Sequence, residues 1–75
     1  MEIFPGVSMD AGIRFGKPCL MGTRVDIATI VGALAGGESY ESVEDNFSVT
    51  REQILVALRY AAHLAAHHPP AVEAT

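Results

Sequence analysis

The chain has 75 residues, 49% of them apolar, and its five Lys and Arg residues are outnumbered by nine Asp and Glu residues, for a formal net charge of −4. This length fits one small domain, and the acidic balance argues against strong DNA binding by a monomer, because nucleic-acid-binding domains usually carry a basic surplus. A core of this size can bury only part of the apolar surface. We therefore expect a protein partner, either a second copy or another protein.

The chain carries no sign of secretion or of a membrane anchor. It shows no signal peptide, and none of its apolar runs reaches the roughly 20 residues that cross a bilayer. Its one cysteine, Cys19, cannot form a disulfide within the chain. We therefore expect a cytoplasmic protein that makes no membrane contact.

Short extended runs separated by turn residues make up the beginning of the chain. Residues 1–6 end in a Pro-Gly pair and are expected to be loosely held, as terminal residues often are. From residue 7 onward apolar and polar side chains alternate, which predicts a two-stranded hairpin or an irregular β-arm over residues 7–22. Because an isolated hairpin is marginal in water, we expect this arm to lie against helices or to pair with the arm of a second subunit.

A first helix is predicted to follow the arm. The run Thr-Arg-Val-Asp at residues 23–26 matches a capping box, so we expect Thr23 to begin this helix. Gly36 and Gly37 end it, since Gly is favoured just past a helix C-terminus. Four apolar residues are spaced to form one core-facing stripe: Ile27, Ile30, Val31 and Leu34.

Two further helices complete the predicted bundle. Ser39 is a suitable N-cap for a short second helix, and Thr50 begins a second capping box that starts a longer third helix. The third helix is expected to run to about residue 66, before Pro69 and Pro70. We therefore predict a mostly α protein that forms a single domain over residues 1–75, with a β-arm at 7–22, a three-helix bundle at 23–66 and a flexible tail at 67–75.

The third helix carries a wider apolar arc than a surface helix needs. Two other helices cannot cover this arc, and its many alanines allow another helix to approach closely, so we expect a homodimer. The candidate contacts to a second copy or to another protein come from the arm and from this helix: Val7, Met9, Ile13, Phe15, Leu20, Leu55, Val56, Tyr60 and Leu64.

A short helix, a tight turn and a longer helix, preceded by a supporting helix, form the layout of a helix-turn-helix domain. The residues at its recognition helix that are able to meet phosphates or base edges are Thr50, Arg51, Gln53 and Arg59. The alternative is a plain three-helix bundle with a solvated first turn. That alternative is favoured by four acidic residues on and before the second helix, whose charge repels phosphate: Glu38, Glu41, Glu44 and Asp45.

The stretch Gly16–Arg24 joins the arm to the bundle and holds two of the five basic residues, Lys17 and Arg24. Glycine-marked corners next to a helix N-terminus can cradle an anion. The stretch nevertheless lacks the glycine spacing and the Lys-Ser/Thr pair of a phosphate-binding loop. We interpret it as an architectural hinge that sets how the arm reaches a partner, with Lys17 and Arg24 as candidate contacts to nucleic acid or protein.

No catalytic or metal-binding constellation is evident. His63 and His67 lie four residues apart and His68 follows, but no acidic residue or Cys lies near them in the sequence, so we interpret them as exposed residues near a helix C-terminus. Cys19, flanked by apolar residues and Pro18, is predicted to be a buried thiol. No pair of carboxylates is marked out as acid and base. We expect no enzyme activity, no cofactor and no metal.

Three segments together resemble the small bacterial proteins grouped as domain of unknown function 433. They are Gly-Lys-Pro-Cys-Leu-Met-Gly-Thr-Arg at residues 16–24, Ala-Gly-Gly-Glu-Ser at 35–39 and Ala-Leu-Arg-Tyr-Ala-Ala at 57–62. The resemblance covers residues 7–62 and implies a homeodomain-like three-helix domain with an N-terminal β-arm. Two departures are Ser48, where the family commonly has Pro, and Met21, where it commonly has a basic residue.

The resemblance also implies a function. Many members of this family are encoded beside a PIN-like nuclease and are taken to be its antitoxin, and such proteins often bind their own operator. Our leading hypothesis is therefore a non-enzymatic antitoxin that neutralises a PIN-like toxin and can bind operator DNA. The alternatives are a DNA-binding regulator without a toxin partner and a homodimeric assembly module.

Overall fold

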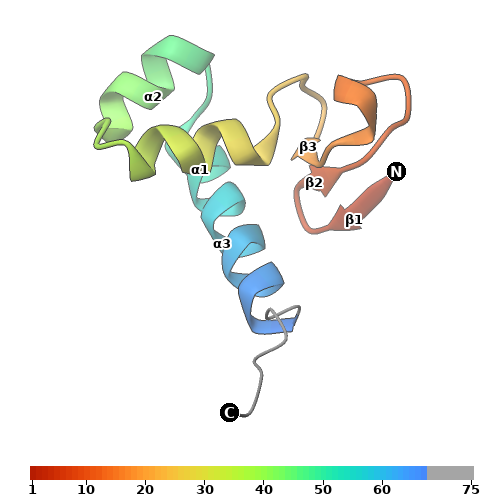
Figure 1. The fold of residues 1–75 in the computed structure, drawn as a ribbon. Coiled ribbons are helices and arrows are strands. Elements are labelled where there is room, and N and C mark those ends of the chain that lie inside the picture. Colours follow the sequence, from red (N-terminus) through yellow and green to blue (C-terminus); the bar gives the residue numbers. More distant parts are fainter. Residues whose placement is uncertain (68–75) are drawn as a thin grey trace, which may run out of the picture.

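The computed structural model describes residues 1–67, in which a small antiparallel sheet is followed by three helices (Figure 1). The strands lie side by side in the order β1 (Glu2–Phe4), β2 (Val7–Ser8) and β3 (Cys19–Leu20). The helices are α1 (Ile27–Ala35), α2 (Tyr40–Phe47) and α3 (Arg51–His67). The mostly α fold with an N-terminal β-arm is thereby confirmed. Apart from His67, the tail predicted at residues 67–75 lies outside the described residues.

The sheet is larger than the predicted hairpin and uses different residues. Residues 1–6, which we expected to be loose, supply β1, and the N-terminal ammonium donates a hydrogen bond of 2.9 Å to the carbonyl of Met9. The extended run expected around Phe15 is instead a tight turn at Arg14–Gly16. Strand β1 is held against the helices because Phe4 packs on α3. The centre of the Phe4 ring lies 5.3 Å from that of Tyr60 and 5.1 Å from that of His63.

The hydrophobic core lies where the sheet, α1 and α3 meet, with α2 covering its far end (Figure 1). Strands β2 and β3 and the three helices each contribute at least one side chain that solvent does not reach, and Phe4 of β1 is partly buried against this core. The largest fully buried side chains are those of Leu20, Ile30, Ile54, Val7 and Val43. Because β2 and β3 each place a residue in this core, the arm is part of the domain. None of the helices within residues 1–67 has the length and apolar character needed to cross a membrane.

The first helix begins later than the capping box predicted. Asp26 is its N-cap, and the Asp26 side chain accepts a hydrogen bond from the N–H of Thr29. Thr23 instead belongs to a turn, in which its hydroxyl donates to the carbonyl of Leu20 and accepts from the N–H of Val25. The correction has a physical reason. The backbone at residues 25–26 pairs with residues 19–20 of β3, so it stays extended and cannot enter the helix.

The caps predicted for the other two helices are confirmed. The hydroxyl of Ser39 accepts a hydrogen bond from the N–H of Ser42 at the start of α2. At the start of α3, the Thr50 hydroxyl accepts from the N–H of Gln53, while the Gln53 side chain accepts from the N–H of Thr50. This reciprocal pair satisfies two backbone donors that would otherwise lack partners within the helix.

Gly6 in the β1–β2 turn holds the arm close to α3. Its φ is +86°, and a Cβ atom added there would lie 2.8 Å from Cγ1 of Val56. We expect Gly6→Ala to lower the free energy of unfolding by about 1–3 kcal/mol, through left-handed backbone strain and overpacking together. Urea denaturation followed by circular dichroism measures this loss.

Gly22→Ala is the matched control for this substitution. Gly22 also has positive φ, +76°, but nothing lies within 4 Å of an added Cβ. Its variant should therefore show the strain alone and lose less stability than Gly6→Ala. Equal losses at the two positions would mean that the contact between the turn and Val56 contributes nothing.

Candidate functional site

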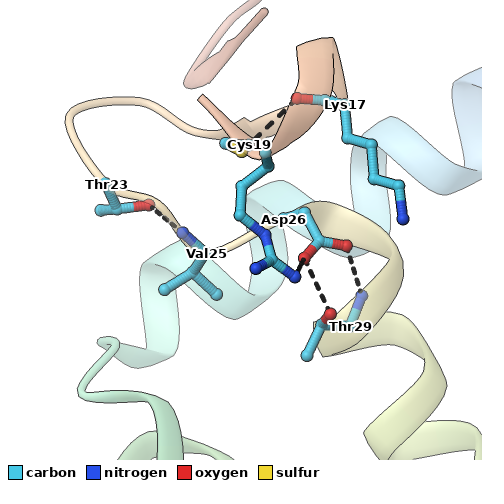
Figure 2. A network of polar contacts seen from close by, with 7 residues as sticks. Lys17, Cys19, Thr23, Val25, Asp26 and Thr29 are labelled. Atoms are coloured by element: carbon cyan, nitrogen blue, oxygen red, sulfur yellow. Dashed lines mark hydrogen bonds and ion pairs between the residues drawn. The ribbon is translucent and has the colours of Figure 1, made fainter. Parts of the chain in front are cut away.

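The joint between the arm and α1 is built around one buried carboxylate, that of Asp26 (Figure 2). Thr29 binds it twice, through its N–H at 3.2 Å and its hydroxyl at 2.8 Å. Nη2 of Arg14 lies 3.2 Å from Asp26 Oδ1 and forms an ion pair with it. One side chain thus caps α1 and also holds the turn at Arg14–Gly16 against the helix.

At Asp26, the hydrogen bonds that lower the pKa of the carboxyl outweigh the burial that raises it. Burial alone raises the pKa of this carboxyl, but the hydrogen bonds from Thr29 and the Arg14 guanidinium hold the pKa below its ordinary value. Burial and the nearby Asp26 charge together raise the pKa of the Cys19 thiol. Cys19 is therefore a protonated, buried side chain, as predicted, and its Sγ–H donates to the carbonyl of Lys17 at 3.4 Å.

The turn that Asp26 holds is left-handed. Arg14, Phe15 and Gly16 have φ values of 51°, 58° and 82°. Two backbone hydrogen bonds close the turn, from the N–H of Gly16 to the carbonyl of Ile13 at 3.0 Å and from the N–H of Lys17 to that of Arg14 at 3.1 Å. The Phe15 side chain gains no packing in exchange, because it is 98% exposed. This pairing of backbone strain with an exposed aromatic side chain is the most unusual feature of the joint.

An apolar pocket of about 320 Å³ opens beside the joint, between α1 and α3. Lys17 is one of its lining residues, and Figure 2 shows the Lys17 side chain running alongside the Asp26 network without a bond to it. The pocket is bounded by Lys17, Pro18, Asp26, Ile27, Ala28, Val31, Tyr60, Ala61 and Leu64. Lys17 therefore lies near the C-terminal half of α3, away from Thr50, Arg51 and Gln53 at the start of that helix.

Interactions within the chain engage the predicted DNA-contacting residues of α3. Arg51 forms ion pairs with Glu44 at 3.1 Å and Glu41 at 3.5 Å, and its guanidinium lies 4.6 Å from the ring centre of Tyr40. Arg59 pairs with Glu52 at 2.7 Å. Thr50 and Gln53 cap the helix, as described above. Binding a phosphate through these side chains would first require breaking these contacts.

The predicted interface residues divide into core and surface. Val7, Leu20 and Tyr60 are buried within the single chain, so they stabilise the domain and are not available as surface contacts. Ile13, Leu55 and Val56 are half-buried. Met9, Phe15 and Leu64 are exposed at 41%, 98% and 37%. Alternation along the arm could not separate these groups, because strands of two or three residues are too short for the pattern to assign a face.

Because β1 joins the sheet, the arm in the structure comprises residues 1–26. Sequence reasoning missed three of its exposed apolar residues, Met1, Ile3 and Met21. The exposure of Met21 could have been predicted, because Met21 directly precedes Gly22 in a turn. Near the sheet, Met1 and Met21 border a shallow depression together with Arg24, Glu2 and Asp10. The arm thus presents flexible methionine side chains among charged groups of both signs.

The histidines of α3 pack on one another. The His63 and His67 ring centres lie 4.3 Å apart, and His63 also contacts Phe4. Within residues 1–67, no three His, Cys, Asp or Glu side chains come close enough together to hold a metal ion. His68 lies outside the described residues.

The family model described as protein of unknown function (DUF433) matches residues 7–61. The chain belongs to this family. No curated protein and no solved structure matches the chain. The DUF433 match runs from β2 into α3, so it contains the left-handed turn, Asp26 and all of the pocket lining except Leu64, whereas β1 lies outside it.

Asp26 links the DUF433 arm to its bundle, so its charge should set the acid stability of the domain. Its pKa is lowered on folding. Its contribution to stability is therefore present above the ordinary Asp pKa and is lost as the pH falls through the folded value. We expect Asp26→Asn, which retains a capping side chain, to lose about 1–3 kcal/mol at neutral pH.

The same variant should lose less stability than the wild type on acidification. Urea denaturation at several pH values between about 3 and 7 tests this. Glu52→Gln is the control, because Glu52 is also ion-paired but is exposed. An exposed pair contributes about 1 kcal/mol or less. If Asp26→Asn lost as much unfolding free energy on acidification as the wild type does, Asp26 would not be the source of the acid sensitivity.

Proposed function

We propose that this DUF433 protein is a non-enzymatic antitoxin that binds and neutralises a PIN-like nuclease toxin through its N-terminal arm. The observation that carries the proposal is where apolar surface remains exposed. Five of the seven large apolar side chains exposed within residues 1–67 lie in the first 21 residues, and they are Met1, Ile3, Met9, Phe15 and Met21. Exposed large apolar side chains that gather in one part of a small domain favour a protein interaction surface there.

The composition of this surface suits a protein partner. Three of its exposed side chains are methionines, which adapt to the shape of an opposing surface. The arm is also the less acidic part of the chain. Residues 1–26 hold three basic and three acidic side chains, whereas residues 27–67 hold two basic and five acidic ones. The arm can therefore approach an acidic protein without the repulsion that the helices would cause.

DNA binding through α3 has less support. The arginines predicted to contact DNA, Arg51 and Arg59, pair with carboxylates of α2 and α3. A regulator that acts on DNA alone would need a basic surface there. We therefore place toxin binding first and operator binding second. The homodimer expected from the sequence stays a prediction.

Co-expression with the product of the neighbouring gene tests the proposal. We expect the two proteins to co-elute as a complex in size-exclusion chromatography. The partner should cleave RNA only after it is separated from this protein. Met21→Asp places a charge in the apolar surface of the arm and should weaken the complex at least tenfold. Glu41→Ala is the control, because the Glu41 side chain lies exposed on α2, outside the arm. A neighbouring product that neither binds the protein nor is inhibited by it would overturn the proposal.

The operator hypothesis is tested separately by gel shift of the upstream promoter DNA at low salt. We expect Arg51→Ala to leave any shift unchanged, because Arg51 is held by Glu41 and Glu44. A strong shift that disappears in Arg51→Ala and falls steeply with salt would instead favour the DNA-binding regulator.

A further inference from the structure

We infer that Phe15, displayed on the left-handed turn, is the anchor by which this protein grips its partner, and that the partner supplies an apolar pocket with an acidic rim. The inference rests on the proposed function, because it names the contact within the toxin-binding surface. It is carried by the backbone conformation at Arg14 and Phe15, by the exposure of Phe15, and by the charges beside it.

The backbone first shows that the display of Phe15 is not a by-product of folding. Two consecutive residues other than Gly adopt positive φ, at 51° and 58°. Such a conformation costs roughly 1–2 kcal/mol per residue relative to the right-handed region. Strain of this kind persists only where the surrounding structure enforces it, and it concentrates at functional sites. Packing of Phe15 does not account for it, because the side chain is 98% exposed.

The turn is also held firmly in place. Arg14 is tied to the buried Asp26 carboxylate, and two backbone hydrogen bonds close the turn on either side of Phe15. Asp26 is in turn fixed by Thr29 of α1. An aromatic side chain presented by such a pre-formed turn loses little conformational entropy on binding. Aromatic side chains that fill a partner's pocket are also the usual source of a large share of binding energy.

The charges next to Phe15 describe the partner. Lys17 follows it by two residues and takes part in no ion pair within residues 1–67. Arg24 lies at the depression that Glu2 and Asp10 also line, so the basic side chains that flank Phe15 in the sequence are Arg14 and Lys17. Arg14 is also half-exposed, although Asp26 binds it. A pocket that accepts Phe15 would therefore meet basic side chains at its edge. Carboxylates around the pocket would be complementary to them.

A second copy of this chain fits this description poorly. The apolar pocket beside the joint is large enough for a phenyl ring, but Lys17 lies at its edge. Asp26 also bounds this pocket, but its carboxylate is already bound by Arg14 and Thr29. Inserting Phe15 of another copy would bring Arg14 and Lys17 of that copy toward this Lys17. Like charges placed together in this way oppose association. The occupant of the surface is therefore a different, acidic protein.

The test compares Phe15→Ala and Phe15→Gly, each co-expressed with the product of the neighbouring gene. Both should bind that partner at least tenfold more weakly than the wild type in calorimetric titration. Phe15→Gly should also melt a few degrees above Phe15→Ala, because Gly adopts positive φ without strain. Tyr40→Ala, which removes a partly exposed aromatic ring from α2, is the control and should bind like the wild type.

The charge requirement is tested by Lys17→Glu, which should weaken binding, and by added salt, which should weaken the wild-type complex. Absence of any wild-type complex would overturn the proposed function and this inference with it. Wild-type binding that Phe15→Ala leaves unchanged would overturn this inference alone. A wild-type dimer that Phe15→Ala converts to a monomer would also overturn it, since the anchor would then serve a second copy.

Discussion

The joint depends on the carboxylate of Asp26. It is buried, and three hydrogen-bond donors from two different parts of the chain converge on it. Two of them begin α1 and the third holds the left-handed turn. Because a buried charge is costly unless each of its partners is in place, this side chain couples the start of the helix to the position of the turn. A small domain with little core can fix a loop in this way without adding hydrophobic residues.

The rest of the molecule divides its residues between stability and display. The core draws one or more side chains from every strand and helix, which leaves few large apolar side chains exposed on the bundle. The arm does both: Val7, Cys19 and Leu20 are buried in the domain, whereas its methionines and Phe15 are exposed. On the helices, Arg51 and Arg59 are paired with carboxylates of the same chain, so these arginines are less available to bind phosphate. Both arrangements support a protein partner more than DNA.

Patterns that depend on neighbouring residues were predictable. The caps at Ser39 and Thr50 and the inward stripe of Ile27 and Ile30 follow from local hydrogen bonding and helical period, and the structure has them. Thr23 matched a capping box equally well, yet pairing of the backbone at Val25 and Asp26 with β3 kept that segment extended. Residues 1–6 became a strand for a similar reason, because Phe4 found Tyr60 on a helix more than fifty residues away.

The sequence by itself determined the order of the three helices, the buried thiol and the family, since each rests on local spacing or on short local motifs. Only the tertiary structure decided the site. Asp26 reads as an ordinary capping residue until Arg14 is placed against it, and Phe15 reads as part of a strand until that ion pair holds the chain in a left-handed turn. Contacts between residues twelve positions apart carry no local periodicity, so they become visible only when the chain has folded.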